Sequence, residues 1–246
     1  MPFLCLIIQF MNKLFQKIKN KLLGVKDPAA TFAKWSFAQN GEDIILYNLF
    51  QLRGIERPGF VDIGAHHPWL MSNTALLYRH GSRGVHVEAN PNLHRHLKAE
   101  RPYDTHVQAG IGPHAGEMLF YEFADASLST FSEAEAQRMQ AVGQTIANTY
   151  TVPVITAQQL IDQYCNARWP SLLCIDVEGY DDVIMDAIHF EHPNSPLVIC
   201  AETAAYHPQG HGEKRTAYMQ AIQQKGYVLW ADTNLNSIFI RQDFWD

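Results

Sequence analysis

The chain has 246 residues, of which 47% are hydrophobic and 18% charged, and its formal net charge is −6 at pH 7. This length is enough for one α/β domain with a full hydrophobic core and a short N-terminal appendage. The acidic balance argues against nucleic acid as the main partner, since no long basic stripe offsets it. The four cysteines show neither CxxC nor Cys/His metal spacing, which favours a reduced, cytoplasmic setting.

Residues 1–35 are predicted to form an apolar and basic helical appendage. Residues 2–11 are apolar but fall short of the ~20 residues that span a bilayer. Residues 12–26 carry five lysines and no acid, and at helical spacing the apolar and basic side chains fall on different faces. Such a helix can lie on an anionic membrane, so one prediction is peripheral contact with the inner membrane face through residues 1–26. The alternatives are a helix packed on the domain or a chain that begins at Met11.

The main domain is predicted to span residues 36–246. The pattern Ser36-x-x-Gln39 is typical of a capping box, and residues 39–52 follow as an amphipathic helix. Glu42 and Asp43 fall in its first turns, where acids favour the helix dipole. The sequence therefore predicts that this helix opens the domain.

Four short apolar runs each end in one carboxylate, namely Asp62, Glu88, Asp176 or Glu202. Continuous aliphatic runs of this length are typical of strands buried on both faces, as in a parallel sheet. In an open parallel sheet the ligand lies outside the carboxyl ends of the strands. The chain is therefore predicted to place a row of acids along one edge of a doubly wound sheet.

The remaining elements alternate in the same way. Strands are predicted at 59–63, 84–88, 105–109, 117–123, 172–176, 197–201, 227–231 and 237–241. Helices are predicted near 73–80, 90–99, 156–164, 180–188 and 214–224, with another opening at Ser132. A polar turn joins the last two strands, which predicts an antiparallel hairpin at the end of a mostly parallel sheet. Residues 124–150 are rich in Ser, Ala and Gln and are predicted to form an insertion or lid above the strand ends.

The first strand and turn indicate the kind of cofactor. They contain one glycine, Gly64, where a dinucleotide fold would show G-x-G-x-x-G, and His66 and Pro68 occupy later positions of that loop. Glu88 nevertheless ends the second strand, near the offset of about 20 residues expected for an acid that binds ribose hydroxyls. A ribose acceptor without a phosphate cradle indicates an unphosphorylated nucleoside cofactor, for which S-adenosylmethionine (SAM) is the candidate. Asp62 would lie near its amino-acid part.

Four segments together resemble the FkbM-type methyltransferases: residues 36–43 (SFAQNGED), 60–65 (FVDIGA), 87–91 (VEANP) and 175–181 (IDVEGYD). Ser127 and Ser129 are similar to a serine cluster of that family. The resemblance implies a Rossmann-like SAM-methyltransferase fold and O-methylation of a hydroxyl, most often on a sugar or a polyketide-type natural product. The cofactor-binding residues that follow from the strand ends and the resemblance are Gln39, Glu42, Asp62, Gly64, Ala65, Glu88, Asn90 and Ser127.

Methyl transfer to an alcohol requires alignment of the reacting atoms and removal of a hydroxyl proton. Asp176 and Glu178 end one predicted strand, while Glu202 ends its neighbour and His207 follows it. These four residues are the catalytic candidates, either as a direct general base or, through Asp176 and Glu202, as ligands of a divalent ion. Oxygen ligands would favour Mg²⁺ or Ca²⁺ over zinc.

Two other functions share some of these features. An NAD(P)-dependent oxidoreductase would use the same sheet and ribose acid, although the missing glycines count against it. A non-catalytic membrane-associated binding module would use the basic N-terminal segment and keep the sheet as a scaffold. The sequence favours the methyltransferase, with a small-molecule or glycan acceptor and no nucleic-acid partner, and leaves the oligomeric state open.

Overall fold

The computed structural model describes residues 28–207 and 212–246. Its contacts divide the chain into two units, residues 1–35 and 36–246. In the first unit one 3-10 turn, η1 (Pro28–Thr31), is described, and the predicted basic helix within residues 12–26 lies outside the described residues. None of the described helices is long and apolar enough to cross a membrane.

Residues 36–246 alternate between strands and helices in nearly the predicted order. The strands of the main sheet are β1 (Phe60–Ile63), β2 (Gly84–Val87), β3 (Thr105–Val107), β7 (Leu172–Ile175), β8 (Val198–Glu202), β9 (Tyr227–Asp232) and β10 (Asn236–Arg241). The α-helices are α2 (Glu42–Leu52), α3 (Ala75–Arg79), α4 (Pro91–Glu100), α5 (Glu133–Ala141), α6 (Ala157–Tyr164), α7 (Asp181–Ala187) and α8 (Thr216–Gln224).

The main sheet has seven strands in the order β3-β2-β1-β7-β8-β10-β9. Its pairs are parallel from β3 to β8, whereas β10 runs antiparallel to both β8 and β9. This confirms the predicted class: a Rossmann-like SAM-methyltransferase fold, mostly parallel and finished by an antiparallel hairpin. The strand order reverses between β1 and β7, and such a switch point is where ligands bind in open α/β sheets.

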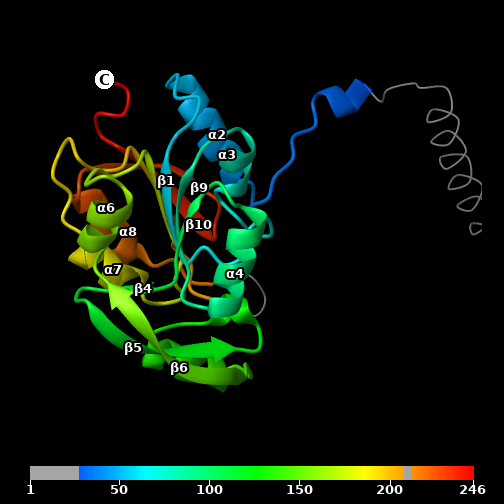
Figure 1. The fold of residues 1–246 in the computed structure, drawn as a ribbon. Helices are drawn as coiled ribbons and strands as arrows, with labels where there is room; N and C mark the ends of the chain where they lie inside the picture. Colours follow the sequence, from blue (N-terminus) through cyan, green and yellow to red (C-terminus); the bar gives the residue numbers. More distant parts are fainter. Residues whose placement is uncertain (1–27, 208–211) are drawn as a thin grey trace, which may run out of the picture. The chain divides into compact units, whose positions relative to one another are not determined.

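Each face of the main sheet has its own apolar core because successive side chains point to opposite faces. Val61 and Ile63 pack with residues of α6, α7 and α8. Phe60 packs with residues of α2 and α3 on the other face. Figure 1 shows α6, α7 and α8 together on one side of the sheet. The strands between these layers are almost fully buried, as the continuous apolar runs predicted.

A second, three-stranded sheet departs from the prediction. It contains β4 (Gly110–Ile111), β5 (Gly116–Phe123) and β6 (Ile146–Ile155) in the order β4-β6-β5, and Figure 1 shows it below the main sheet. The sequence predicted β5 but not its antiparallel partner β6. Residues 124–150, predicted to form an insertion or lid, hold the 3-10 turn η2 (Ala126–Leu128), α5 and the first half of β6.

The start of α2 also corrects the prediction. The helix begins at Glu42 behind Gly41, which has φ of 86° and provides no side-chain cap. Ser36 Oγ instead donates to Asp43, and so does the backbone N–H of Phe37, both at 2.7 Å. Ser36 and Gln39 are thus not a capping box, because the buried Asp43 carboxylate organises this turn from inside the helix.

Candidate functional site

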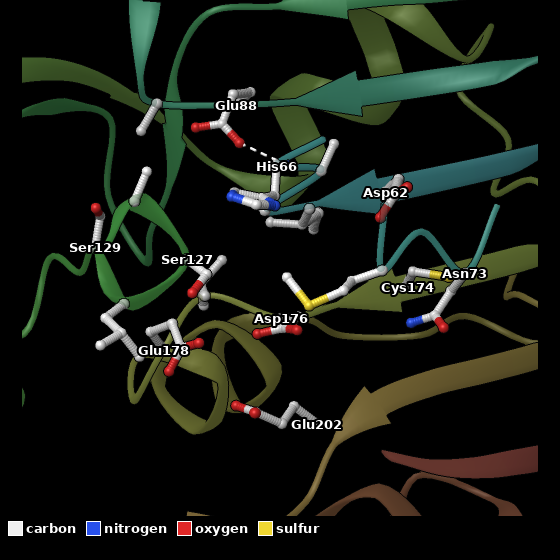
Figure 2. A pocket seen from close by; sticks show the side chains of 18 of the residues that line it. Asp62, His66, Asn73, Glu88, Ser127, Ser129, Cys174, Asp176, Glu178 and Glu202 are labelled. Carbon is white, nitrogen blue, oxygen red and sulfur yellow. Dashed lines mark hydrogen bonds between the residues drawn. The ribbon is translucent and has the colours of Figure 1, made fainter. Parts of the chain in front are cut away.

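A cavity of about 290 Å³ opens at the carboxyl ends of β1, β2, β7 and β8, on both sides of the switch point. This volume is close to the lower end of the range for small-molecule sites, about 300–1,000 Å³. Most of the predicted site residues line it: Gln39, Asp62, Gly64, Ala65, Glu88, Ser127, Asp176, Glu178, Glu202 and His207. Figure 2 shows Glu88 and His66 on one side of the cavity and the acids that follow β7 and β8 on the other.

Two predicted cofactor residues do not line the cavity. Glu42 is fully buried, and its carboxylate accepts hydrogen bonds from Asn40 N, Thr233 Oγ1 and Asn236 Nδ2. It therefore ties α2 to the turn between β9 and β10. Asn90 caps α4, since its Oδ1 accepts from the backbone N–H of residues 92 and 93.

Glu88 closes the far end of the cavity. Its Oε2 accepts the backbone N–H of His66 at 2.8 Å and its Oε1 that of Asn90 at 2.7 Å. Its exposure is 6%, and burial raises the pKa of this carboxyl to about 7 against the opposing effect of the two backbone hydrogen bonds. A carboxylate has about four acceptor sites, so each oxygen retains capacity for a ligand hydroxyl.

Gly64 links the two halves of the site. Its φ is 81°, and a Cβ at this position would lie 1.7 Å from the carbonyl oxygen of Asp176. The backbone of Gly64 thus lies directly against the end of β7. The glycine therefore lets the β1 and β7 ends meet at the cavity floor.

Three carboxylates on the opposite wall form a compact group, which we call the acid trio: Asp176, Glu178 and Glu202. Each offers an oxygen within 4.8 Å of the others. Asp176 and Glu178 are half-buried, whereas the Glu202 side chain belongs to a residue only 7% exposed. Parallel pairing of β7 with β8 creates the group, because it brings the two strand ends to the same level.

No cation in the described part of the chain forms an ion pair with the acid trio. The arginines whose charges act on it, Arg138 and Arg215, are paired with Glu135 and with Asp181. Loss of water contact together with neighbouring negative charge raises the pKa of Asp176 to about 7. The same causes raise the pKa values of Glu178 and Glu202 well above their usual range.

The backbone that carries Glu178 is unusual. Glu178 and Gly179 have φ of 51° and 81°, and the first of these is a left-handed conformation that costs a non-glycine residue free energy. Thr130 Oγ1 donates to the Glu178 carbonyl at 2.7 Å, and a Cβ on Gly179 would lie 2.9 Å from Glu135 Cγ. Thr130 and Glu135, which precede β6 in the chain, thus hold the turn at Glu178 in place.

Several lining residues were not predicted. Ala109, Gly110 and Ile111 follow β3, which ends at Val107 rather than at the predicted residue 109. The acids were predicted because ligands bind outside the carboxyl ends of parallel strands. The same reasoning, applied to the true end of β3 at Val107, would have predicted these three residues as well. Asn234 lines the cavity from the β9–β10 turn, where its φ of 75° was not evident from the sequence.

Comparison with known proteins is consistent with this architecture. The family model described as the methyltransferase FkbM domain matches residues 62–229. None of the proteins with curated descriptions matches the chain significantly.

Solved structures of low sequence identity also resemble the chain. A TehB-like SAM-dependent methyltransferase from Corynebacterium glutamicum is 12% identical with a TM-score of 0.40, covering 94% of this chain and 97% of that one. Precorrin-6y C5,15-methyltransferase from Geobacter metallireducens is 12% identical with a TM-score of 0.41, covering 85% and 92%. Aeropyrum pernix fibrillarin with natively bound S-adenosyl-L-methionine is 9% identical with a TM-score of 0.36, covering 79% and 74%. Because the family match spans more than half of the chain, the protein belongs to the FkbM methyltransferase family and is a SAM-dependent methyltransferase.

Proposed function

We propose that this methyltransferase transfers the methyl group of SAM to a hydroxyl of a small-molecule or glycan acceptor, with a sugar as the first candidate. The observation that carries the proposal is the acid trio, which lies across the same cavity from Glu88. One wall thus offers hydrogen-bond acceptors for a nucleoside, and the other offers groups that take up a proton.

The chain's own residues fit the cofactor. Glu88 has two oxygens with spare acceptor capacity toward the ribose hydroxyls, and Asp62 offers a negative charge to the amino-acid part. Bound SAM would supply an electrophilic methyl group on a sulfonium. The positively charged sulfonium would also be favoured by a cavity whose described acids outnumber its cations.

An acid with a pKa near the working pH is suited to general-base catalysis. The pKa of about 7 places Asp176 in that range. Glu178 and Glu202 face the same space and hold their protons more tightly than an exposed carboxyl does. We assign the direct general base to Asp176, with the other two acids orienting the acceptor and sharing the released proton. His207 lines the cavity nearby and stays a candidate for contact with the acceptor.

A divalent ion is the alternative for the same three acids. Asp176, Glu178 and Glu202 provide only oxygen ligands, which suit Mg²⁺ or Ca²⁺, and the ion would neutralise charge that the described residues leave uncompensated. Glu202 supplies the second argument for a cation, because the residue is only 7% exposed and its carboxylate takes part in none of the hydrogen bonds between described residues. Such an ion would lower the pKa of a coordinated hydroxyl.

The test uses the full chain with SAM and a panel of sugars, phenols and amines. Methylated products are identified by mass spectrometry, and linkage analysis distinguishes O-methyl from N-methyl groups. The proposal predicts O-methylation of a sugar or related alcohol, which Asp176→Asn slows by about 10²–10⁴-fold. Methylation confined to amines would contradict it. A parallel series of activity assays, first with chelator and then with added Mg²⁺, distinguishes the direct general base from the metal-ion mechanism. Binding of NADH is measured as the test of the oxidoreductase alternative.

We also propose a cytoplasmic location with peripheral membrane contact through residues 1–26. The support is the run of lysines without acids in residues 12–26. Flotation with anionic vesicles tests the proposal: the full chain should float with them and a chain lacking residues 1–26 should not. Equal behaviour of the two would contradict the contact while leaving the methyltransferase proposal intact.

A further inference from the structure

Four ionisable side chains meet on the sheet face that α2 and α3 cover. We call Asp62, His86, Arg101 and Asp104 the buried ion cluster; their side chains are 11%, 1%, 0% and 0% exposed. Within the cluster only Asp62 lines the cavity. The cluster therefore connects the interior of the domain with the floor of the proposed cofactor site.

His86 lies between the two carboxylates of the cluster. Parallel pairing places it beside Asp62 on β1 and His106 on β3, so that all three side chains share one face. Its Nε2 is 3.0 Å from Asp104 Oδ2 and forms a hydrogen bond with it. Its Nδ1 is buried and 3.5 Å from Asp62 Oδ2, an ion-pair distance, and it forms no hydrogen bond with the described residues. A neutral imidazole has one N–H and one lone pair, so one carboxylate would face a lone pair. Only the imidazolium offers an N–H to each side.

The charge balance of the cluster also favours a protonated His86. Arg101 Nε donates to Asp104 Oδ2 at 3.0 Å, and its Nη1 donates to Thr74 Oγ1, also at 3.0 Å. Thr74 Oγ1 in turn donates to Asp62 Oδ2 at 2.7 Å. Two carboxylates and one guanidinium leave an excess negative charge in the interior, which is unfavourable. A proton on His86 brings the cluster to neutrality.

The other groups around His86 do not supply this charge. The His106 ring stacks on it at 5.3 Å, and its Nε2 contacts the carbonyl oxygen of Arg101 at 2.9 Å. Burial lowers the pKa of His106, which favours its neutral form. Phe60 presents a ring edge at 5.5 Å and carries no charge.

We propose that His86 is a positioning residue that acts as a cation beneath the cofactor, holding the Asp62 carboxylate ionised and fixed at the cavity floor. This inference rests on the proposed binding of SAM at the same floor. Burial alone would raise the pKa of Asp62, but the contact with His86, followed by Thr74 and Arg101, lowers it overall. The cofactor thus meets a carboxylate that is already charged and oriented.

The first experiment titrates S-adenosylhomocysteine (SAH) into full-length wild type, His86→Gln and the matched control His106→Gln by calorimetry. His86→Gln is expected to weaken SAH binding about tenfold, the equivalent of one pKa unit of lost interaction. His106→Gln, which removes a stacked ring without an ion contact to Asp62, should change affinity less than about twofold. In an Asp62→Asn background the His86→Gln effect should vanish, since coupled residues are non-additive.

The pH profile separates positioning from a merely structural role. Without the imidazolium, burial would raise the pKa of Asp62, so the ratio of wild-type to His86→Gln affinity should widen as the pH falls. The ratio is used because Glu88, with its pKa of about 7, titrates in both proteins. A ratio that stays constant with pH would contradict the proposal.

The ¹⁵N shifts of the His86 ring in wild type give a measurement that needs no variant to fold. Two protonated ring nitrogens at neutral pH are expected, and a single protonated nitrogen would overturn the inference. If wild type binds SAH and His86→Gln binds it equally well, the inference fails while the proposed function stands. If folded wild type binds no SAH, the proposed cofactor site itself fails.

Discussion

Asp62 of the buried ion cluster and the three acids of the acid trio line the same cavity, but the two groups differ in their counter-charges. Asp62 and Asp104 have Arg101 and His86 beside them. In the acid trio, no described cation forms an ion pair with Asp176, Glu178 or Glu202. The pKa of Asp62 is accordingly lowered, whereas the pKa values of the trio are raised.

This difference indicates that the carboxylates on the two sides of the switch point have different roles, cofactor binding on one side and reaction on the other. A compensated carboxylate keeps its charge and its orientation, which suits a group that binds. An uncompensated one takes up a proton or a cation readily, which suits a group that reacts. The comparison can be tested by adding or removing charge on either side.

The largest effect is expected at the acid trio. Asp176→Asn removes the group assigned as general base, so methyl transfer should fall by about 10²–10⁴-fold. SAH affinity should change less than about threefold, because the variant leaves Glu88 and Asp62 intact. Turnover with a saturating acceptor and calorimetry with SAH measure the two quantities. If SAH affinity fell as much as turnover, Asp176 would contribute to cofactor binding, which would contradict its assignment as a group that acts only in the reaction.

The next largest effect is expected in the buried ion cluster. Arg101→Met leaves Asp62 and Asp104 without their guanidinium, and breaking a buried ion pair costs about 3–5 kcal/mol of the free energy of unfolding. Arg95→Met, an exposed arginine on α4, should stay within about 0.5 kcal/mol. Urea denaturation measures both. Equal stability of the two variants would mean that Arg101 carries no essential charge.

The pH dependence should have opposite signs in the two regions. The folded-state pKa of Asp176, about 7, lies above its usual value near 4, so the folded protein binds the proton more tightly than the unfolded chain. Its contribution to stability is therefore complete below about pH 4 and is lost as the pH rises through about 7. Asp62, with its lowered pKa, contributes stability above its usual value and loses it as the pH falls further.

Glu202→Gln sharpens this prediction. Removing one negative charge from the acid trio should flatten the decline in stability between about pH 4 and about pH 7. Asp104→Asn, the same type of change in the compensated region, should instead lower stability throughout. Urea midpoints across the pH range measure this, and a steeper decline in Glu202→Gln would contradict the assignment of repulsion to the trio.

The smallest effect is expected from metal ions. Mg²⁺ at about ten times its dissociation constant should stabilise the folded protein by about 1.4 kcal/mol. For a chain of this size that raises Tm by about 3–6 °C. The rise should be larger near pH 7.5 than near pH 5.5 and absent in Glu202→Gln. An equal rise in that variant would place the ion elsewhere.

Much of the fold followed from local patterns. The apolar runs ending at Asp62 and Asp176 predicted buried parallel strands, and the helix predicted near 156–164 is present as α6, which begins at a capping box formed by Thr156 and Gln159. Strand β6 was missed because its polar, threonine-rich first half resembles a loop. Pro153 lies within this strand and pairs there with Glu117 of β5.

The site was harder to predict where tertiary contacts assign the role. Glu42 follows the motif of the resemblance, but its partners Thr233 and Asn236 lie almost 200 positions later in the chain. The strand-end rule identified the acids of both walls. It could not indicate His86, which lies within a strand and acquires its partners only when β1, β2 and β3 assemble.

The most direct test compares two buried glutamates at the carboxyl ends of strands, Glu88 after β2 and Glu202 at the end of β8. SAH is titrated calorimetrically into wild type, Glu88→Gln and Glu202→Gln. The account predicts saturable one-to-one binding to wild type, weakened about tenfold or more in Glu88→Gln and less than about threefold in Glu202→Gln. Absence of SAH binding by folded wild type, or equal weakening in both variants, would contradict it.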